Sequence, residues 1–206
     1  MRGAAQTAAG GSRNFHVRDS VPDHDRDRVV YEAHRVQVLL NVGDDLEIKP
    51  GTVVNETNQY HYKTVKTRVL RLFKGSQEVQ TLTPGGSMSI ETALDMTLGK
   101  NDALAGCIAS HLGALPEIAT SVRLRYTLFP ELFGSAGATK VEALKMSEML
   151  LLSVDTSMTV GVVKKLGRQE IDLSLKVPIV PFTGDNVGIA RNINNHWRLI
   201  GQGEIV

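Results

Sequence analysis

The sequence predicts an all-β protein built from two consecutive β-barrels. Short runs in which apolar and polar residues alternate are separated by turn residues, chiefly Gly, Pro, Asn and Asp. Helix signals are scarce, and even "SEMLLLSV" (147–154) favours a strand because of its Val, its Ser and its flanks. A stretch with Gly and Pro, "HLGALPEIATS" (111–121), divides two such series. Many short strands at regular spacing are typical of barrels, which we expect over 15–115 and 119–206.

The first series follows a leader of small and polar residues. Residues 1–14 lack an apolar segment, so we expect a flexible leader or an artificial remnant outside the fold. Strands are predicted for "VVYEAHRVQVLL" (29–40) and, after the turn "NVGDD", for "LEIKP" (46–50). A further strand is predicted for "DALAGCIA" (102–109), where Cys107 is expected to be a small buried hydrophobe.

One strand of this series breaks its own alternation. In "YKTVKTRVLRLF" (62–73), Val69 and Phe73 lie among polar residues, but Leu70 and Leu72 are out of step with them. A β-bulge adds one residue to a strand and so changes which face the following side chains occupy. We therefore expect a bulge or a change of register here.

The second series alternates more cleanly. "SVRLRYTLF" (121–129) and "EIDLSLKV" (170–177) place apolar residues at every second position, and "VGIARNI" and "HWRLIGQGEIV" complete the series. Chain ends fray unless they are tied down, so the apolar last segment is expected to close a sheet. We expect Trp197, Leu199 and Ile205 to face the barrel interior. Two glycines, Gly201 and Gly203, would permit the curvature of closure.

Composition narrows the class of protein. The net charge is +1, from 23 Lys and Arg against 22 Asp and Glu, which argues against binding to nucleic acid through bulk charge. A single cysteine excludes an internal disulfide framework and suits a reducing compartment. No apolar run reaches the length needed to cross a bilayer, and no secretory signal opens the chain. We expect a soluble cytoplasmic protein without a membrane role.

No constellation of catalytic residues or nucleotide ligands is recognisable. "GSAGATK" (134–140) lacks the spacing of a phosphate-binding loop, and "TGDNVG" (183–188) reads as a turn between strands. The cluster "DHDRD" (23–27) has metal-binding residue types but no rigid frame, so a solvated loop is expected. From its residues alone, this chain is a binding or structural β protein with no metal site and no enzyme activity.

Several stretches in a fixed order resemble the second and third domains of the gamma subunit of translation initiation factor 2. They are "VGDDLEIKPG" (42–51), "TPGG" with "ALD" (83–95), "KNDALAG" (100–106), "RLRYTLFPELFG" (123–134), "LLLSVDTSMTVGVV" (150–163) and "HWRLIGQG" (196–203). The "GDDLEI" type of match is shared with elongation factors generally, whereas "WRLIG" and "RLRYTLF" are more specific to the gamma subunit. One departure is "VVYEAHRVQVLL", which lacks the glycines found there in the family, so the local surface must differ.

The resemblance implies barrels of the elongation factor Tu domain II and III type. It also implies a GTPase domain, absent from this chain, that would hold GTP and magnesium and make the full-length parent a GTPase. The family carries initiator methionyl-tRNA to the small ribosomal subunit as a heterotrimer with alpha and beta subunits, and its second barrel packs against the GTPase domain. Two alternatives stay open: the barrels of a selenocysteine-specific elongation factor, and a free-standing interaction barrel.

Two candidate sites follow from the resemblance. The pocket for the tRNA acceptor end falls near "GGSMSIETALD" (85–95), with Ser89, Ile90, Glu91 and Thr92 as its lining; an ordinary barrel strand is the alternative.

The alpha subunit would dock on "FKGSQE" (73–78), with Lys74, Gly75 and Gln77 at a turn; a solvated hairpin tip is the alternative. Basic residues precede this turn, and phosphate contacts and simple solubility are both open for them. They are Lys63, Lys66, Arg68 and Arg71.

Overall fold

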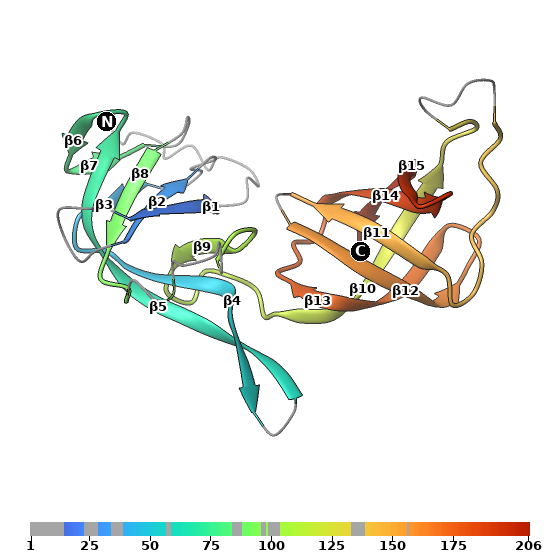
Figure 1. Ribbon diagram of the computed structural model, residues 1–206, viewed down its shortest axis with the longest axis horizontal. Helices are drawn as coiled ribbons and strands as arrows, with labels where there is room; N and C mark the ends of the chain where they lie inside the picture. Colours follow the sequence, from blue (N-terminus) through green and yellow to red (C-terminus); the bar gives the residue numbers. More distant parts are fainter. Residues whose placement is uncertain are drawn as a thin grey trace, which may run out of the picture. The chain divides into compact units, whose positions relative to one another are not determined.

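In the computed structural model the chain divides into two units built from β-strands (Figure 1). The structure describes residues 15–22, 29–33, 39–56, 59–83, 88–95, 98, 104–132, 139–155 and 157–206. Every element named in these ranges is a strand, which confirms the predicted fold class. The first unit comprises Met1–Glu47 and Lys66–Ala114, and the second comprises Ile48–Val65 and Leu115–Val206. The predicted domain limits, 15–115 and 119–206, stay a prediction.

The larger sheet closes on itself and contains strands of the first unit together with the parts of β4 and β5 that lie within Ile48–Val65. Its strand order is β4-β9-β1-β2-β8-β5-β6, and β4 also pairs with β5, so the order forms a ring that β6 extends. A separate two-stranded ladder joins β3 to β7. The strands are β1 (Phe15–Pro22), β2 (Val29–Ala33), β3 (Leu40–Asn41), β4 (Asp45–Glu56), β5 (Gln59–Lys74), β6 (Gln77–Val79), β7 (Thr81–Leu82), β8 (Met88–Thr92) and β9 (Ile108–His111).

The predicted bulge lies in β5. Opposite β8, Val69 pairs with Thr92 and Arg71 pairs with Glu91, so Leu70 is an extra residue without a counterpart. Val69 and Leu72 are both buried, although strict alternation would put them on opposite faces. The bulge prediction is therefore confirmed.

The sequence placed one strand too early. Residues 104–106 form a turn, closed by a hydrogen bond from the Cys107 N–H to the Leu104 carbonyl at 3.1 Å, and β9 begins only at Ile108. Gly106 has a φ of 78°, a conformation that interrupts a strand and that glycine adopts without strain. Cys107 is buried, as expected of a small hydrophobe. The predicted strand 29–40 is described only at its ends, since residues 34–38 lie outside the described ranges.

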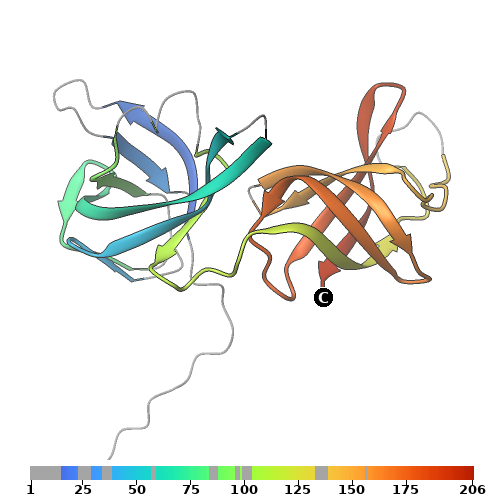
Figure 2. The same cartoon turned by 90° about the horizontal axis from the view of Figure 1, so that it is seen from below.

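The second unit contains a closed barrel of six antiparallel strands in the order β10-β13-β12-β11-β14-β15 (Figure 2). Alternate residues of each strand fill its interior, among them the buried Leu124, Leu152 and Leu173. The strands are β10 (Ala119–Leu128), β11 (Met149–Val154), β12 (Ser157–Leu166), β13 (Glu170–Ile179), β14 (Asn186–Ile193) and β15 (His196–Ile205).

The last strand closes this barrel. β15 pairs with β14 on one side and with β10 on the other. A Cβ at Gly201 would lie 2.5 Å from the Thr127 carbonyl oxygen, so no side chain fits between the closing strands there. The closing role predicted for the terminal segment is confirmed.

The predicted burial of Trp197 is wrong. Trp197 is 42% exposed and Leu199 is 45% exposed, whereas Ile205 is buried as expected. The cause is a bulge: Ile189 pairs with Gly201 but Ala190 pairs with Leu199, so Ile200 is an extra residue in β15. Ile200 turns into the core, and the side chains before it change face, which puts Trp197 and Leu199 on the outside.

Candidate docking surfaces

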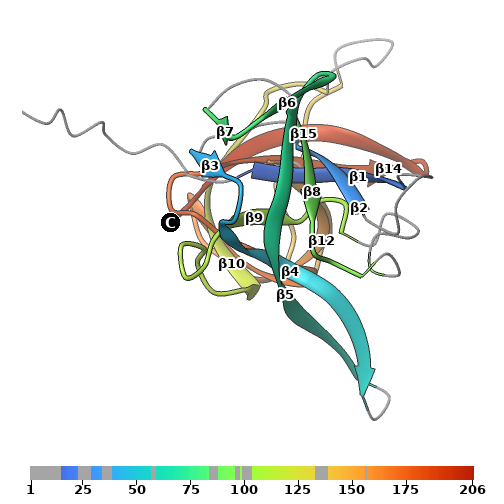
Figure 3. The ribbon, with the colours of Figure 1, turned by 90° about the vertical axis from the view of Figure 1, so that its left-hand side faces the viewer.

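Three adjacent strands of the first unit present a charged face. In the sheet β5 pairs with β8 and, near its end, with β6, and Figure 3 labels all three strands. Arg71 and Phe73 project on the side opposite the buried Leu72. Cross-strand partners on the same side are Glu91 and Ser89 of β8 and Glu78 of β6, because directly opposed residues of an antiparallel pair share a face.

Arg71 connects the three strands of this face. Its Nε and Nη2 donate to the two carboxylate oxygens of Glu78 at 3.0 and 2.5 Å, and its Nη1 lies 3.4 Å from Glu91 Oε2. The guanidinium carbon also lies 4.8 Å from the centre of the Phe73 ring. Hydrogen bonding to Glu78 raises the pKa of Arg71 further above its ordinary value, so the residue is always a cation.

The predicted acceptor-end residues lie together on β8, but most of their side chains are inaccessible. Ile90 and Thr92 are buried, and Glu91 is only 1% exposed. β8 is a central strand, paired with β2 and β5, so its backbone groups face partners on both edges. Ser89 is the member of this set whose side chain reaches the surface. The acceptor-end role of the four residues stays a prediction.

The predicted alpha-docking residues form an exposed turn. Lys74 pairs with Gln77 at the end of the β5–β6 hairpin, and Gly75 has a φ of 61°, which the tight turn requires. All three residues are exposed. The role of this turn stays a prediction, and what the sequence did not reveal is its attachment to Arg71 at the base.

The basic residues of β5 do not act as one patch. Arg68 is bound to Asp45, with Nε and Nη2 donating at 2.7 and 3.1 Å, and Arg71 is bound to two glutamates. Lys63 and Lys66 are exposed and project to opposite faces of the strand. Pairing with carboxylates therefore neutralises the two arginines, Arg68 and Arg71, of this basic stretch.

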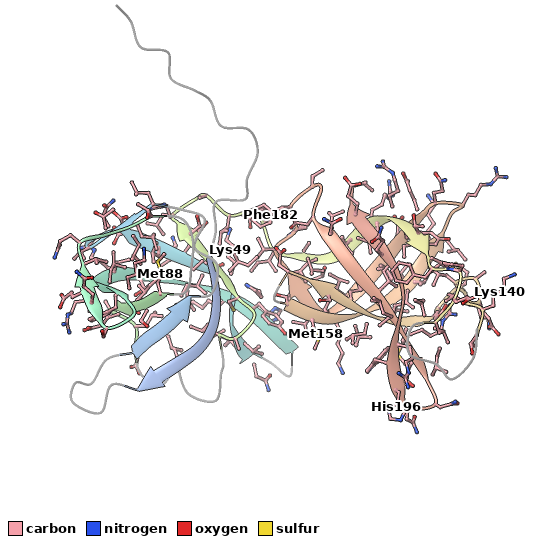
Figure 4. All side chains as sticks on the ribbon, turned by 90° about the horizontal axis from the view of Figure 1, so that it is seen from above. Lys49, Met88, Lys140, Met158, Phe182 and His196 are labelled. Atoms are coloured by element: carbon pink, nitrogen blue, oxygen red, sulfur yellow. The ribbon has the colours of Figure 1, made fainter. Side chains whose placement is uncertain are left out.

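The second barrel has a broad apolar outer face on β11, β12, β14 and β15. In one row across the strands, Val160 pairs with Leu151, Leu151 with Ala190 and Ala190 with Leu199. The most exposed members are Met158 and Met149, at 66% and 63%. Figure 4 labels Met158 and, at the end of the β14–β15 hairpin, His196. We call this set the outer apolar face: Met149, Leu151, Met158, Val160, Val162, Ala190, Trp197 and Leu199.

The sequence missed this outer apolar face for a physical reason. β11, β12 and β14 carry apolar residues on both faces, and alternation cannot then tell the core from an exposed surface. The available signal was the continuous apolar run in "MLLLSV", because a barrel strand with one solvated face should alternate apolar and polar residues.

Other motifs contribute little to a site. "DHDRD" (23–27) and most of "GSAGATK" lie outside the described residues. The described part of the chain holds no group of three or more His, Cys, Asp or Glu side chains arranged to bind a metal ion. Within those residues there is also no helix long and apolar enough to cross a membrane.

Comparison with solved structures defines the class of fold. The crystal structure of a bacterial selenocysteine-specific elongation factor, EF-Sec, superimposes with a TM-score of 0.65 at 13% sequence identity, covering 93% of this chain and 27% of that one. At this identity the likeness shows the fold alone, and it is the paired β-barrel fold found in translation factors.

Sequence comparison defines the family. Residues 120–205 match the family model "Initiation factor eIF2 gamma, C terminal". Translation initiation factor 2 subunit gamma of Methanococcus vannielii is 39% identical over 171 residues, and that of Pyrococcus abyssi is 40% identical over 170. These matches cover 83% and 82% of this chain, and 42% and 41% of the two relatives. The chain belongs to the gamma-subunit family of translation initiation factor 2 and spans about two fifths of the length of these relatives.

Proposed function

We propose that this chain supplies the two β-barrels of a GTP-dependent initiation factor that carries initiator methionyl-tRNA to the small ribosomal subunit in the cytoplasm. Family membership supports the role in initiation. GTP and magnesium would be held by a GTPase domain, as in the gamma-subunit arrangement, and we assign no catalytic residue to this chain.

The observation that carries this proposal is the outer apolar face of the second barrel. Trp197 and Leu199 are almost half exposed, and with Met149, Met158 and Ala190 the face extends over four strands. A soluble barrel rarely exposes that much contiguous apolar surface unless a partner covers it. In this proposal the partner is the GTPase domain, which the second barrel of this family packs against.

The charged face of the first unit would serve the other partners. The exposed turn with Lys74 and Gln77 would dock the alpha subunit, and the neighbouring Ser89 would lie at the tRNA acceptor end. These two candidate sites are on adjacent strands, since Ser89 pairs with Phe73 just before the turn. The beta subunit is a further expected partner of the same factor.

Reconstitution tests this function. The chain would be combined with a separately produced GTPase domain of a gamma-subunit relative, and retention of initiator methionyl-tRNA on a filter would be measured with GTP and with GDP. We expect retention only with both proteins and GTP, and not of elongator methionyl-tRNA. Failure of the mixture under conditions where the full-length relative retains the tRNA would contradict the proposal. Preference for another aminoacyl-tRNA would favour an elongation factor.

A further inference from the structure

The β5–β6 hairpin is stabilised by the side chain of Arg71, which lies outside its turn. Arg71 lies three residues before Lys74 and makes a two-pronged hydrogen bond to Glu78, the residue just after Gln77. Two interactions therefore close the hairpin. Next to the turn, Lys74 pairs with Gln77 through the backbone, and further from the turn the Arg71 side chain is bonded to Glu78.

Arg71 is itself fixed by Glu91, which lies outside the hairpin, and by the ring of Phe73 within it. Its Nη1 faces the buried Glu91 of β8 at 3.4 Å, and its guanidinium stacks on Phe73. Two strands and an aromatic ring therefore restrict a side chain that would otherwise sample many rotamers. Because the guanidinium is planar and its donors form a fixed fork, Glu78 can satisfy both oxygens in one orientation only.

We propose that Arg71 is a positioning residue that holds the Lys74–Gln77 turn in one conformation for docking of the alpha subunit. This inference rests on the docking role proposed above. A turn ordered before the encounter loses less conformational entropy when it binds, and a larger share of encounters is productive. Arg71 itself is only about a quarter exposed and acts through Glu78.

The test separates positioning from direct contact by kinetics. Arg71→Gln, Glu78→Gln and the double variant would be compared with the parent chain for binding of the isolated alpha-subunit docking domain by surface plasmon resonance. If the turn becomes mobile, the docking-competent fraction falls, and we expect the association rate to fall about tenfold with an unchanged dissociation rate. The double variant should bind no more weakly than either single one, because the two residues act as a unit.

Two further variants control for the fold. Arg68→Gln removes a matched two-pronged pair, with Asp45, from the same strand but away from the turn, and it should bind like the parent. Arg71→Lys keeps a cation beside Glu91 but loses the fork to Glu78, so it should melt like the parent and still associate more slowly. Amide hydrogen exchange of Gly75 and Gln77 should rise in Arg71→Gln.

Each outcome is decisive. Parent-like association of Arg71→Gln would overturn the positioning role, and so would weakening that arises from faster dissociation, which indicates a direct contact. Absence of binding by the parent chain would instead refute the proposed docking itself. Slow association of the Arg71 and Glu78 variants, the double variant included, with parent-like association of Arg68→Gln supports the inference.

Discussion

The charged face of the first unit and the outer apolar face of the second barrel are built in opposite ways. The first concentrates ion pairs around Arg71, one of them to the buried Glu91. The second spreads uncharged side chains such as Met149 and Leu199 over four strands. A charged face gains specificity from fixed donors and acceptors, whereas an apolar face gains affinity from the area that it removes from water. The two surfaces should therefore respond differently to mutation, salt and pH.

The largest effect should be the difference in stability between substituting an inward-facing and an outward-facing residue of β11. Leu152 is completely buried and Leu151 beside it belongs to the outer apolar face. Leu152→Ala should lower the free energy of unfolding by about 2–5 kcal/mol, because it leaves a cavity. Leu151→Ala should cost about 1 kcal/mol or less. Urea denaturation measures both, and equal losses would contradict the assignment of the two faces.

Binding of a GTPase domain should instead depend on the outward-facing residues of this barrel. Trp197→Ala should weaken docking of a GTPase domain by about 2 kcal/mol, roughly thirtyfold in Kd, if Trp197 lies in the centre of that interface. Its effect on the melting temperature should be small, since the indole is 42% exposed. Calorimetric titration of the parent and the variant provides the measurement. Unchanged affinity would show that this face serves another partner.

Salt should distinguish the two surfaces. Raising the ionic strength from about 0.1 to 1 M shortens the Debye length from about 10 to 3 Å. We expect slower association at the charged turn with Lys74 and little loss of affinity at the outer apolar face. Parallel binding curves at the two salt concentrations test this, and equal salt dependence at both surfaces would remove the contrast.

The smallest effects should appear in the pH dependence of stability. Substitution of one Asp in each unit should change the stability in opposite directions. Burial would raise the pKa of Asp44, but hydrogen bonds from the Asn41 N–H and His111 hold it below its usual value. Burial, reinforced by the charge of Asp155, raises the pKa of Asp185, whose Oδ2 has no hydrogen-bond partner among the described residues.

The signs follow from linkage. A lowered carboxyl pKa contributes stability above the unfolded pKa that is lost as the pH falls through the folded pKa, so Asp44→Asn should destabilise at pH 7. A raised pKa costs stability at neutral pH, and the cost disappears as the pH falls through the folded pKa, so Asp185→Asn should stabilise at pH 7. Shifts of about 2 °C in Tm are expected at pH 7. At pH 4 the effect of Asp44→Asn should persist, because the folded pKa of Asp44 lies below 3.8, whereas the effect of Asp185→Asn should already be smaller there. Shifts of the same sign would refute this account.

Much of the fold followed from the sequence because its signals are local. Alternation in β10 and β13 identified core residues such as Leu124 and Leu173, although Val177 of the same row is exposed, and the mismatch around Leu70 identified a bulge. The early start predicted for β9 failed because "DALAGCIA" has no charged or other strongly polar residue after Asp102, and only the positive φ of Gly106 shows where the turn ends.

The candidate sites depended more on tertiary structure. The sequence located the turn with Lys74 and Gln77, since Gly75 marks it. It could not show that Arg71 reaches both Glu78 and Glu91, because those pairings join strands up to 20 residues apart. Local sequence patterns likewise do not predict how far a side chain is buried. Three of the four residues predicted at the acceptor end are buried.

Trp197 illustrates the difference between what the sequence determined and what the tertiary structure decided. The sequence by itself determined that the last segment is a strand and that Gly201 and Gly203 allow it to close a barrel, because strand propensity and the absence of a side chain are properties of the residues themselves. Only the tertiary structure decided that Trp197 faces outward, because one extra residue, Ile200, reverses the faces of everything before it. A bulge is fixed by how two strands pair, and that pairing is a property of the folded sheet.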